Sequence, residues 1–267
     1  MYAFTYHRPK SLREAASLLA KSEDAKFLAG GHSLLPVMKQ RLAAPSALID
    51  LAGIPELTGI ERTPRSLAIG AITKHVEVET SSVVKEAIPA ITDLVSVLGD
   101  PAVRNRGTIG GSVAGNDPST DWPAAVLGLG ATVSTNKRKI HADEFFKGLF
   151  ETALEEGEIV TRVSFPIPQK AGYKKFRHPA SRYALVGVFV AKRSDGIRVA
   201  VTGAGANGVF RWTEAEAALA NRFSPKSLEG LSASQEGLNS DIHADAEYRA
   251  HLIGVMARRA VAAAVER

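Results

Sequence analysis

The stretch Ala29-Gly30-Gly31-His32-Ser33 decides the fold, together with a second diglycine stretch, Thr108-Ile109-Gly110-Gly111-Ser112, about eighty residues later. Adjacent glycines allow a positive φ and remove the Cβ atoms that would hold a ligand away from the backbone amides. A helical pattern with Pro36 in its opening turn follows the first stretch, whereas no clear helix follows the second. Two such anion cradles would suit a pyrophosphate held from both sides. A diglycine alone is more often an ordinary turn, so that alternative stays open.

Composition limits the chemistry that this chain can perform alone. Its 267 residues, 45% of them hydrophobic, are enough for one or two domains with a sizeable core. There is no cysteine, which excludes disulfides, thiolate metal sites, an iron–sulfur cluster ligated in this chain and a cysteinyl-linked flavin. Any redox chemistry must therefore come from a bound organic cofactor.

Charge and hydropathy exclude two further classes of protein. The net charge is +5, but the basic residues are scattered, and the tightest run is only Lys137-Arg138-Lys139. No nucleic-acid-binding motif accompanies them, so we expect no nucleic-acid partner. No run approaches the roughly 18 apolar residues of a membrane span, and the opening residues lack a signal-peptide pattern. We therefore expect a cytoplasmic protein without a membrane span.

Hydrophobic periodicity predicts the elements of the first 165 residues. Helices are expected over residues 11–19 and 34–42, and strands over 26–29 and 47–51, which makes a βαβ-like unit of the opening fifty residues. Farther along, strands are expected at 66–70, 131–135 and 158–165, and helices over 73–98 and 123–129. Pro89 should interrupt the long helical stretch, because proline lacks an amide N–H and fixes φ.

Pro166 and Pro168, followed by residues 169–172, mark the predicted domain boundary. Strands are expected at 173–177, 184–193 and 197–202, with a hairpin turn at residues 194–196. Helices near residue 213 and over 245–266 would then cover one face of this three-stranded β-meander. The predicted fold class is α+β.

Both glycine stretches and their surroundings resemble the paired FAD-binding signature of the medium subunit of molybdenum-containing hydroxylases. Aerobic carbon monoxide dehydrogenase, nicotine and quinoline oxidoreductases and the flavin portion of xanthine dehydrogenase belong to that family. The segments that carry the resemblance are 29–42, 108–125, 6–9, 69–75, 157–160 and 181–184. The resemblance implies a two-part FAD-binding domain of the vanillyl-alcohol-oxidase/PCMH type over residues 1–170, with subdomains of about 1–57 and 58–170. It further implies a C-terminal domain of the carbon monoxide dehydrogenase flavoprotein type over residues 173–267.

The same resemblance assigns candidate cofactor-binding residues. The two loops would hold the FAD pyrophosphate through Ala29, Gly30, Gly31, His32, Ser33 and Leu34 on one side and Thr108, Ile109, Gly110, Gly111 and Ser112 on the other. Ser33 and Thr108 are expected side-chain donors. Many relatives carry Asn where this chain has Ser112, which would give a shorter reach, and His32 could equally be structural.

Asp121 and Tyr183 are the two candidates outside the loops. Asp121 stands where relatives place an acidic residue that accepts hydrogen bonds from the ribityl hydroxyls, a task that suits an acceptor-only carboxylate. Alternatively, Asp121 is a loop or helix-capping residue that precedes Trp122-Pro123. Tyr183 aligns with an aromatic residue near the isoalloxazine ring, although it could instead be a core residue. Arg182 departs from the acidic residue that some relatives have there.

The resemblance implies an electron-transfer subunit. FAD would be bound non-covalently and would pass electrons from two [2Fe-2S] clusters of a small subunit to an external acceptor, while a large subunit holds molybdopterin. The complex would be a heterotrimer that is itself dimerised. No catalytic acid or base and no metal ligand is assigned to this chain. The motif spacing leans toward a carbon monoxide dehydrogenase-like medium chain; the substrate and the terminal acceptor are not encoded here.

Two alternatives remain open at the level of sequence. An autonomous FAD oxidoreductase, such as an enzyme like UDP-N-acetylenolpyruvylglucosamine reductase, would need its own substrate acid and a basic clamp for the nucleotide sugar, and neither is evident. A non-catalytic adaptor could keep the fold without flavin, although the glycines of both loops are intact.

Overall fold

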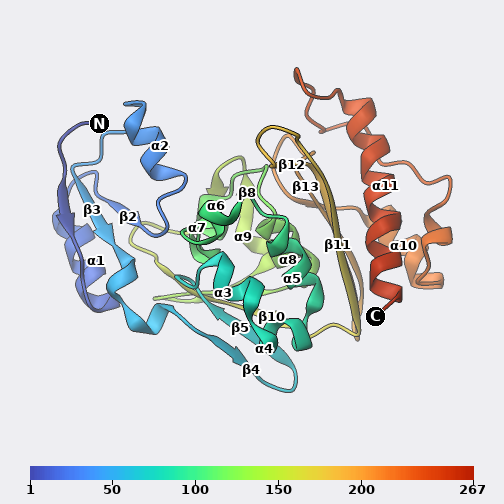
Figure 1. The fold of residues 1–267 in the computed structure, drawn as a ribbon, viewed down its shortest axis with the longest axis horizontal. Helices are drawn as coiled ribbons and strands as arrows, with labels where there is room; N and C mark the ends of the chain where they lie inside the picture. Colours follow the sequence, from blue (N-terminus) through green and yellow to red (C-terminus); the bar gives the residue numbers. More distant parts are fainter.

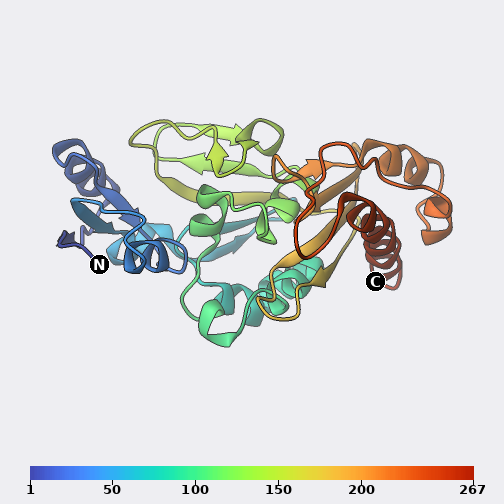
Figure 2. The ribbon, with the colours of Figure 1, turned by 90° about the horizontal axis from the view of Figure 1, so that it is seen from above.

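Three main sheets follow one another along the long axis of the molecule, from the N-terminal region at one end to the C-terminal helix at the other (Figure 1). The structure is a computed structural model that describes all residues from 1 to 267. A view turned by 90° keeps the same order of the three regions (Figure 2). Helices and strands are mixed throughout, as the α+β prediction requires.

A small parallel sheet with strand order β1-β3-β2 forms the N-terminal region. Its elements are β1 (Thr5–His7), α1 (Leu12–Lys21), β2 (Lys26–Leu28), α2 (Leu34–Lys39), β3 (Ala47–Asp50) and the 3-10 turns η1 (Leu51–Gly53) and η2 (Pro55–Leu57). Both β1 and β2 pair with β3 in parallel. The βαβ-like unit is confirmed, whereas β1 was not predicted, because its three residues are too few to show alternation.

A five-stranded antiparallel sheet with the order β4-β5-β10-β6-β7 forms the middle region. Its strands are β4 (Ile60–Arg62), β5 (Ser66–Gly70), β6 (Thr132–Thr135), β7 (Lys139–His141) and β10 (Val160–Pro166), and a separate hairpin holds β8 (Phe146–Gly148) and β9 (Glu151–Thr152). Its helices are α3 (His75–Thr80), α4 (Ser82–Ala87), α5 (Pro89–Ser96), α6 (Pro101–Arg104), α7 (Ile109–Gly115), α8 (Trp122–Gly128) and α9 (Ala142–Phe145).

Two helix predictions of the middle region have opposite outcomes. The predicted break is confirmed, since α4 ends at Ala87 and Pro89 opens α5. The expectation that no helix follows the second diglycine is wrong, because α7 begins directly after Thr108. The Thr108 side chain caps this helix by accepting a hydrogen bond from the amide of Gly111. Three glycines lower the helix propensity of α7, so the sequence pattern does not show it.

A four-stranded antiparallel sheet with the order β11-β12-β13-β14 follows. Its region contains β11 (Lys170–Arg177), β12 (Ala184–Arg193), β13 (Gly196–Thr202), β14 (Phe210–Arg211), α10 (Thr213–Asn221), η3 (Pro225–Leu228) and α11 (Ala246–Val265). The sheet therefore has one strand more than the predicted three-stranded meander, because Phe210 and Arg211 add β14 to the edge of β13.

The C-terminal sheet shares its two faces between two cores. Ala171 and Tyr173 of β11 belong to the large core of the middle region, which also contains Trp122. Val186 and Val188 of β12 belong to the core beneath α11. In Figure 1 the sheet stands between α11 on one side and α5 and α8 on the other. Side chains of β11 that point away from α11 therefore reach the middle region.

No helix of the structure is both long enough and apolar enough to cross a lipid bilayer.

Candidate functional site

A cavity of about 650 Å³ lies where the N-terminal and middle regions meet, with a rim contributed by the C-terminal region. Every predicted cofactor-binding residue lines it except Ile109. The Ile109 side chain is fully buried in the core of the middle region, so only its neighbours can reach a ligand. The structure thus brings together residues that are up to about 150 positions apart in the sequence, from Ala29 to Tyr183.

The first diglycine loop presents a row of unpaired backbone amides. The N–H groups of residues 30–34 donate to no acceptor of the protein. Gly31 has a φ of 78°, in the left-handed region that favours glycine, and this turns the chain from β2 into α2. Successive free amides in such a turn form an anion-binding nest. The first loop therefore has the geometry that a phosphate group needs.

Contact with residues 106 and 107, just before the second loop, fixes the position of the first loop. A Cβ atom on Gly30 would overlap the carbonyl oxygen of Arg106, so the two loops approach each other here by backbone alone. Gly30 therefore sets the distance between the loops, while Gly31 sets the direction of the amides.

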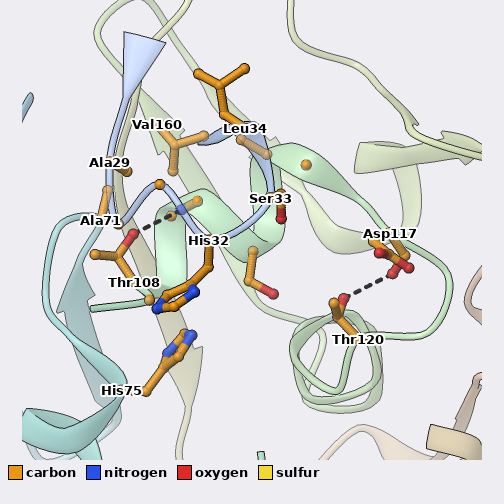
Figure 3. Close-up of a pocket in the computed structure, with 18 of the residues that line it drawn as sticks. Ala29, His32, Ser33, Leu34, Ala71, His75, Thr108, Asp117, Thr120 and Val160 are labelled. Carbon is orange, nitrogen blue, oxygen red and sulfur yellow. Dashed lines mark hydrogen bonds between the residues drawn. The ribbon is translucent and has the colours of Figure 1, made fainter. Parts of the chain in front are cut away.

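The second diglycine loop differs, because its amides are already paired. Ile109 donates to the carbonyl of Thr73 at 3.3 Å and Gly110 to that of Ala71 at 2.8 Å. The amide of Gly111 donates to the hydroxyl oxygen of Thr108 at 3.2 Å, as Figure 3 shows, and Ser112 donates to the Thr108 carbonyl. The expectation that both loops offer free amides to an anion is therefore wrong for the second loop. What it offers are the hydroxyls of Thr108 and Ser112, both of which line the cavity.

The two glycines of the second loop also have different surroundings. A Cβ atom on Gly110 would lie 2.5 Å from the Cβ of Ala71, so Gly110 is required for α7 to pack against the chain after β5. A Cβ atom on Gly111 would lie 3.0 Å from the Thr108 hydroxyl and 3.5 Å from the Cβ of Ala29, with no backbone close by. A small side chain at Gly111 would therefore need only a slight shift of the Thr108 side chain, and it would enter the cavity that Gly111 lines.

Asp121 lines the cavity, but both of its carboxylate oxygens already have partners in the protein. Oδ2 lies 2.9 Å from the ammonium group of Lys175, and Oδ1 accepts a hydrogen bond from the Tyr173 hydroxyl. Burial raises the pKa of Asp121 above its ordinary value, and the Lys175 charge and these hydrogen bonds offset only part of that rise. Asp121 does not use its side chain to cap α8, so the helix-capping alternative is not what the structure shows.

Tyr183 lies at the rim of the cavity with almost half of its surface exposed. A tight turn holds it: His178 donates its amide to the Tyr183 carbonyl at 2.9 Å, and its ring Nδ1 accepts from the amides of Ala180 and Ser181. Arg182, at a φ of 62°, completes the turn and also lines the cavity. The alternative of a core tyrosine is therefore wrong.

His75 is a cavity residue that the site prediction missed. Its ring faces that of His32 across the cavity wall (Figure 3). Nδ1 accepts a hydrogen bond from the indole N–H of Trp122 at 3.2 Å, so the neutral ring carries its proton on Nε2. Burial, with help from nearby His32 and Arg104, lowers the pKa of His75 to about 4. His75 is therefore neutral at physiological pH.

Phe150 is a second missed residue, and its position is imposed by Asn116. Phe150 has a φ of 57°, which is unusual for a bulky residue, and is largely exposed at the cavity. The side-chain amide of Asn116, itself buried, donates to the carbonyls of Gly148 and Glu151 at 2.8 Å each. The Asn116 carbonyl also accepts the amide of Phe150. No local sequence pattern shows such a clamp.

Asp117, Thr120 and the segment Glu158–Val160 are further cavity residues that the site prediction missed. They lie within the stretches that carry the family resemblance, which is the only signal that could have found them. Arg138 pairs with Glu158 at 3.0 Å and lowers its pKa to about 2, so this buried carboxylate stays ionised in the cavity wall.

These residues fit a flavin dinucleotide. The free amides of residues 30–34 suit a pyrophosphate. Apolar side chains that line the same cavity, including Leu28, Ile72, Leu98 and Val160, suit aromatic rings.

Comparison with known proteins identifies the family. Residues 2–168 match the model of the FAD binding domain in molybdopterin dehydrogenase. The chain belongs to this family. FAD is accordingly its cofactor, and the predicted resemblance, oxidoreductase class and role as a medium FAD subunit are confirmed.

Relatives in this FAD-binding family match over nearly their whole length. The carbon monoxide dehydrogenase medium chain of Hydrogenophaga pseudoflava is 35% identical over 277 residues, covering 98% of this chain and 96% of the relative. The nicotine 6-hydroxylase medium subunit of Paenarthrobacter nicotinovorans is 37% identical over 273 residues, covering 97% and 96%.

A solved structure supports the same placement. Reconstituted CO dehydrogenase from Oligotropha carboxidovorans contains a chain that is similar with a TM-score of 0.89 at 34% identity, covering 100% of this chain and 99% of that one. The fold described above is thus that of the FAD-binding family over the full chain.

Proposed function

We propose that the first diglycine loop binds the pyrophosphate of FAD and that the chain uses this FAD to pass electrons through a molybdenum hydroxylase complex. The observation that carries the proposal is the row of unpaired amides at residues 30–34 beside a cavity of about 650 Å³. Bound FAD supplies one- and two-electron chemistry, while the protein supplies position and electrostatics. Thr108 and Ser112 contribute hydroxyls, and His32, Ser33, Asp121 and Tyr183 line the remaining wall.

The partners follow from the relatives, which are named as medium or beta subunits of multi-subunit enzymes. In this proposal a small subunit with two [2Fe-2S] clusters delivers electrons to FAD, and a large molybdopterin subunit oxidises the substrate. The heterotrimer is dimerised and cytoplasmic. A carbon monoxide dehydrogenase-like medium chain is the narrower form of the proposal, supported by 35% identity to two carbon monoxide dehydrogenase medium chains.

The proposed domain division follows the sequence boundary. Residues 1–170 form a two-part FAD-binding domain of the PCMH type, with subdomains of about 1–57 and 58–170. Residues 173–267 form the C-terminal domain. The core beneath α11 supports a separate C-terminal domain, and the core of the N-terminal region, which also includes Ile72 and Ile159 of the middle region, supports the first subdomain. The core that β11 shares with the middle region ties the two domains together.

Two steps test the proposal. The tagged chain is first purified at native expression together with whatever binds it, and FAD is then removed from the isolated complex. We expect a large and a small partner, and we expect the flavin-free complex to be reduced by substrate but to lose turnover with an external acceptor. An autonomous FAD enzyme would purify alone and remain active. An adaptor would show no visible flavin absorbance.

A further inference from the structure

A buried ion pair forms part of the wall of the flavin cavity. The side chains of Lys175 and Asp121 are 2% and 3% exposed, and their charged atoms lie 2.9 Å apart. Asp121 lines the cavity, whereas Lys175 and its neighbour Tyr173 do not. Of these three residues, only Asp121 forms part of the cavity wall, and its two partners lie behind it in the C-terminal sheet.

Strand geometry brings both partners of Asp121 to one side of β11. Tyr173 and Lys175 are two residues apart, so they share the face that packs against the middle region, while exposed Lys174 lies on the other face. The hydroxyl of Tyr173 and the ammonium group of Lys175 then take one carboxylate oxygen each.

An ion pair at this depth needs a reason beyond stability. Removing two charges from water costs several kcal/mol per ion, and a protein with well-packed apolar residues in place of a buried ion pair is often at least as stable. A lone carboxylate in the same place would take up a proton, because burial raises the pKa of Asp121 and Lys175 opposes that rise. A protonated carboxyl would have lost part of its capacity to accept hydrogen bonds.

We infer that Lys175 is a positioning residue for the cofactor: its buried ammonium group holds Asp121 as an ionised, fixed hydrogen-bond acceptor on the wall of the FAD cavity. The inference rests on the proposed FAD site. It makes flavin retention depend on a residue of the C-terminal sheet that does not itself line the cavity, and it leaves no free rotation to the Asp121 carboxylate, since each oxygen is anchored.

The test compares Lys175→Met with the matched control Lys174→Met, which removes a lysine from the other face of the same strand. Apoprotein of the full chain is titrated with FAD, and its thermal melting is recorded. We expect Lys174→Met to bind FAD as the wild type does and Lys175→Met to bind it about tenfold to a hundredfold more weakly, as for loss of a charge-assisted hydrogen bond. The affinity of Lys175→Met should also rise with pH as Asp121 loses its proton. The other ionisable groups near Asp121 are Tyr173 and Tyr183, and Tyr183 in turn lies near Asp117.

A double variant separates positioning from structure. Asp121→Asn combined with Lys175→Met removes both charges, so folding stability should recover relative to Lys175→Met alone while FAD binding stays weak. Wild-type affinity in the double variant, or equal affinity of the two single lysine variants, overturns the inference. If the wild-type chain itself binds no FAD, the proposed function fails instead, which keeps the two failures distinct.

Discussion

The two diglycine loops look alike in sequence but differ in the hydrogen bonding of their backbone amides. Residues 30–34 keep their amides unpaired, whereas all four amides of residues 109–112 are paired: Ile109 and Gly110 donate to Thr73 and Ala71, and the other two donate to Thr108, the cap of α7. The first loop is therefore the one that we propose as the anion receptor, whereas the second loop lines the cavity with the hydroxyls of Thr108 and Ser112 and the open side of Gly111. The difference shows that a diglycine predicts where a ligand can come close to the backbone, but not which atoms will hold it.

Replacing Gly31 should produce the largest effect on the first loop. Gly31→Val at a φ of 78° would move the free amides and put a branched side chain beside them, so we expect no FAD to be retained. Gly237→Val is the matched control, because Gly237 has a φ of 75° with open space around it. Both variants should lose about 1–3 kcal/mol of stability, and only Gly31→Val should lose the flavin absorbance. Full FAD occupancy in Gly31→Val would reduce the first loop to a structural turn.

The glycines of the second loop should separate folding from binding. Gly110→Ala forces a Cβ atom against Ala71 and should cost about 1–3 kcal/mol of unfolding free energy. Gly111→Ala should change stability by less than about 1 kcal/mol, since helix propensity offsets the close contact with Thr108. It should nevertheless weaken FAD binding about tenfold, or about 1.4 kcal/mol, because the methyl group enters the cavity. Chemical denaturation and FAD titration of both variants measure this, and an unstable Gly111→Ala with normal affinity would refute the assignment.

His75 should make the anchoring of the second loop sensitive to acid. Its amide donates to the Gly107 carbonyl at 2.9 Å, next to the loop. The folded-state pKa of about 4 lies below the ordinary value of 6.5, so the unfolded chain binds the extra proton between these values. This contribution to stability is complete above pH 6.5 and is lost as pH falls toward 4, by about 2 kcal/mol at pH 5. Thermal melting of wild type and His75→Gln between pH 7 and 5 checks it, and parallel pH profiles would contradict it.

Thr108 should give the smallest effect. Thr108→Val keeps the shape of the side chain but removes the oxygen that caps α7 through Gly111, which should cost about 1 kcal/mol of stability. A hydroxyl is lost from the cavity as well, so FAD affinity should fall a few-fold, about 0.5–1.5 kcal/mol for a neutral hydrogen bond. Ser112→Ala removes the other hydroxyl without touching the cap, so it should lower affinity alone. Equal stability losses in the two variants would argue against the capping role.

The sequence predicted those features that depend on neighbours along the chain. Pro89 breaks the helix because of its own ring, and the first glycine loop lies between a predicted strand and a predicted helix, as the structure has it. The state of the amides of Ile109 and Gly110 could not be predicted, since their acceptors are carbonyls of Thr73 and Ala71, more than thirty residues away. The same limit applies to the two-residue strand β14, which forms only because β13 lies beside it.

The site residues likewise divide into those that the motifs indicated and those whose position depends on distant parts of the chain. Those inside the two motifs were found from the family resemblance, and all except Ile109 line the cavity. Lys175 was not found because its relation to Asp121 spans 54 residues and two regions of the molecule. Phe150 was missed since an exposed aromatic carries no local signal until Asn116 is seen to hold its turn.

A titration of the full apoprotein with FAD and with FMN tests the central claim most directly. The claim is that the free amides of residues 30–34 hold a pyrophosphate, a group that FAD has and FMN lacks. We predict that FAD binds far more tightly than FMN and that Gly31→Val removes this preference. Equal affinity of the wild-type chain for the two flavins would contradict the account.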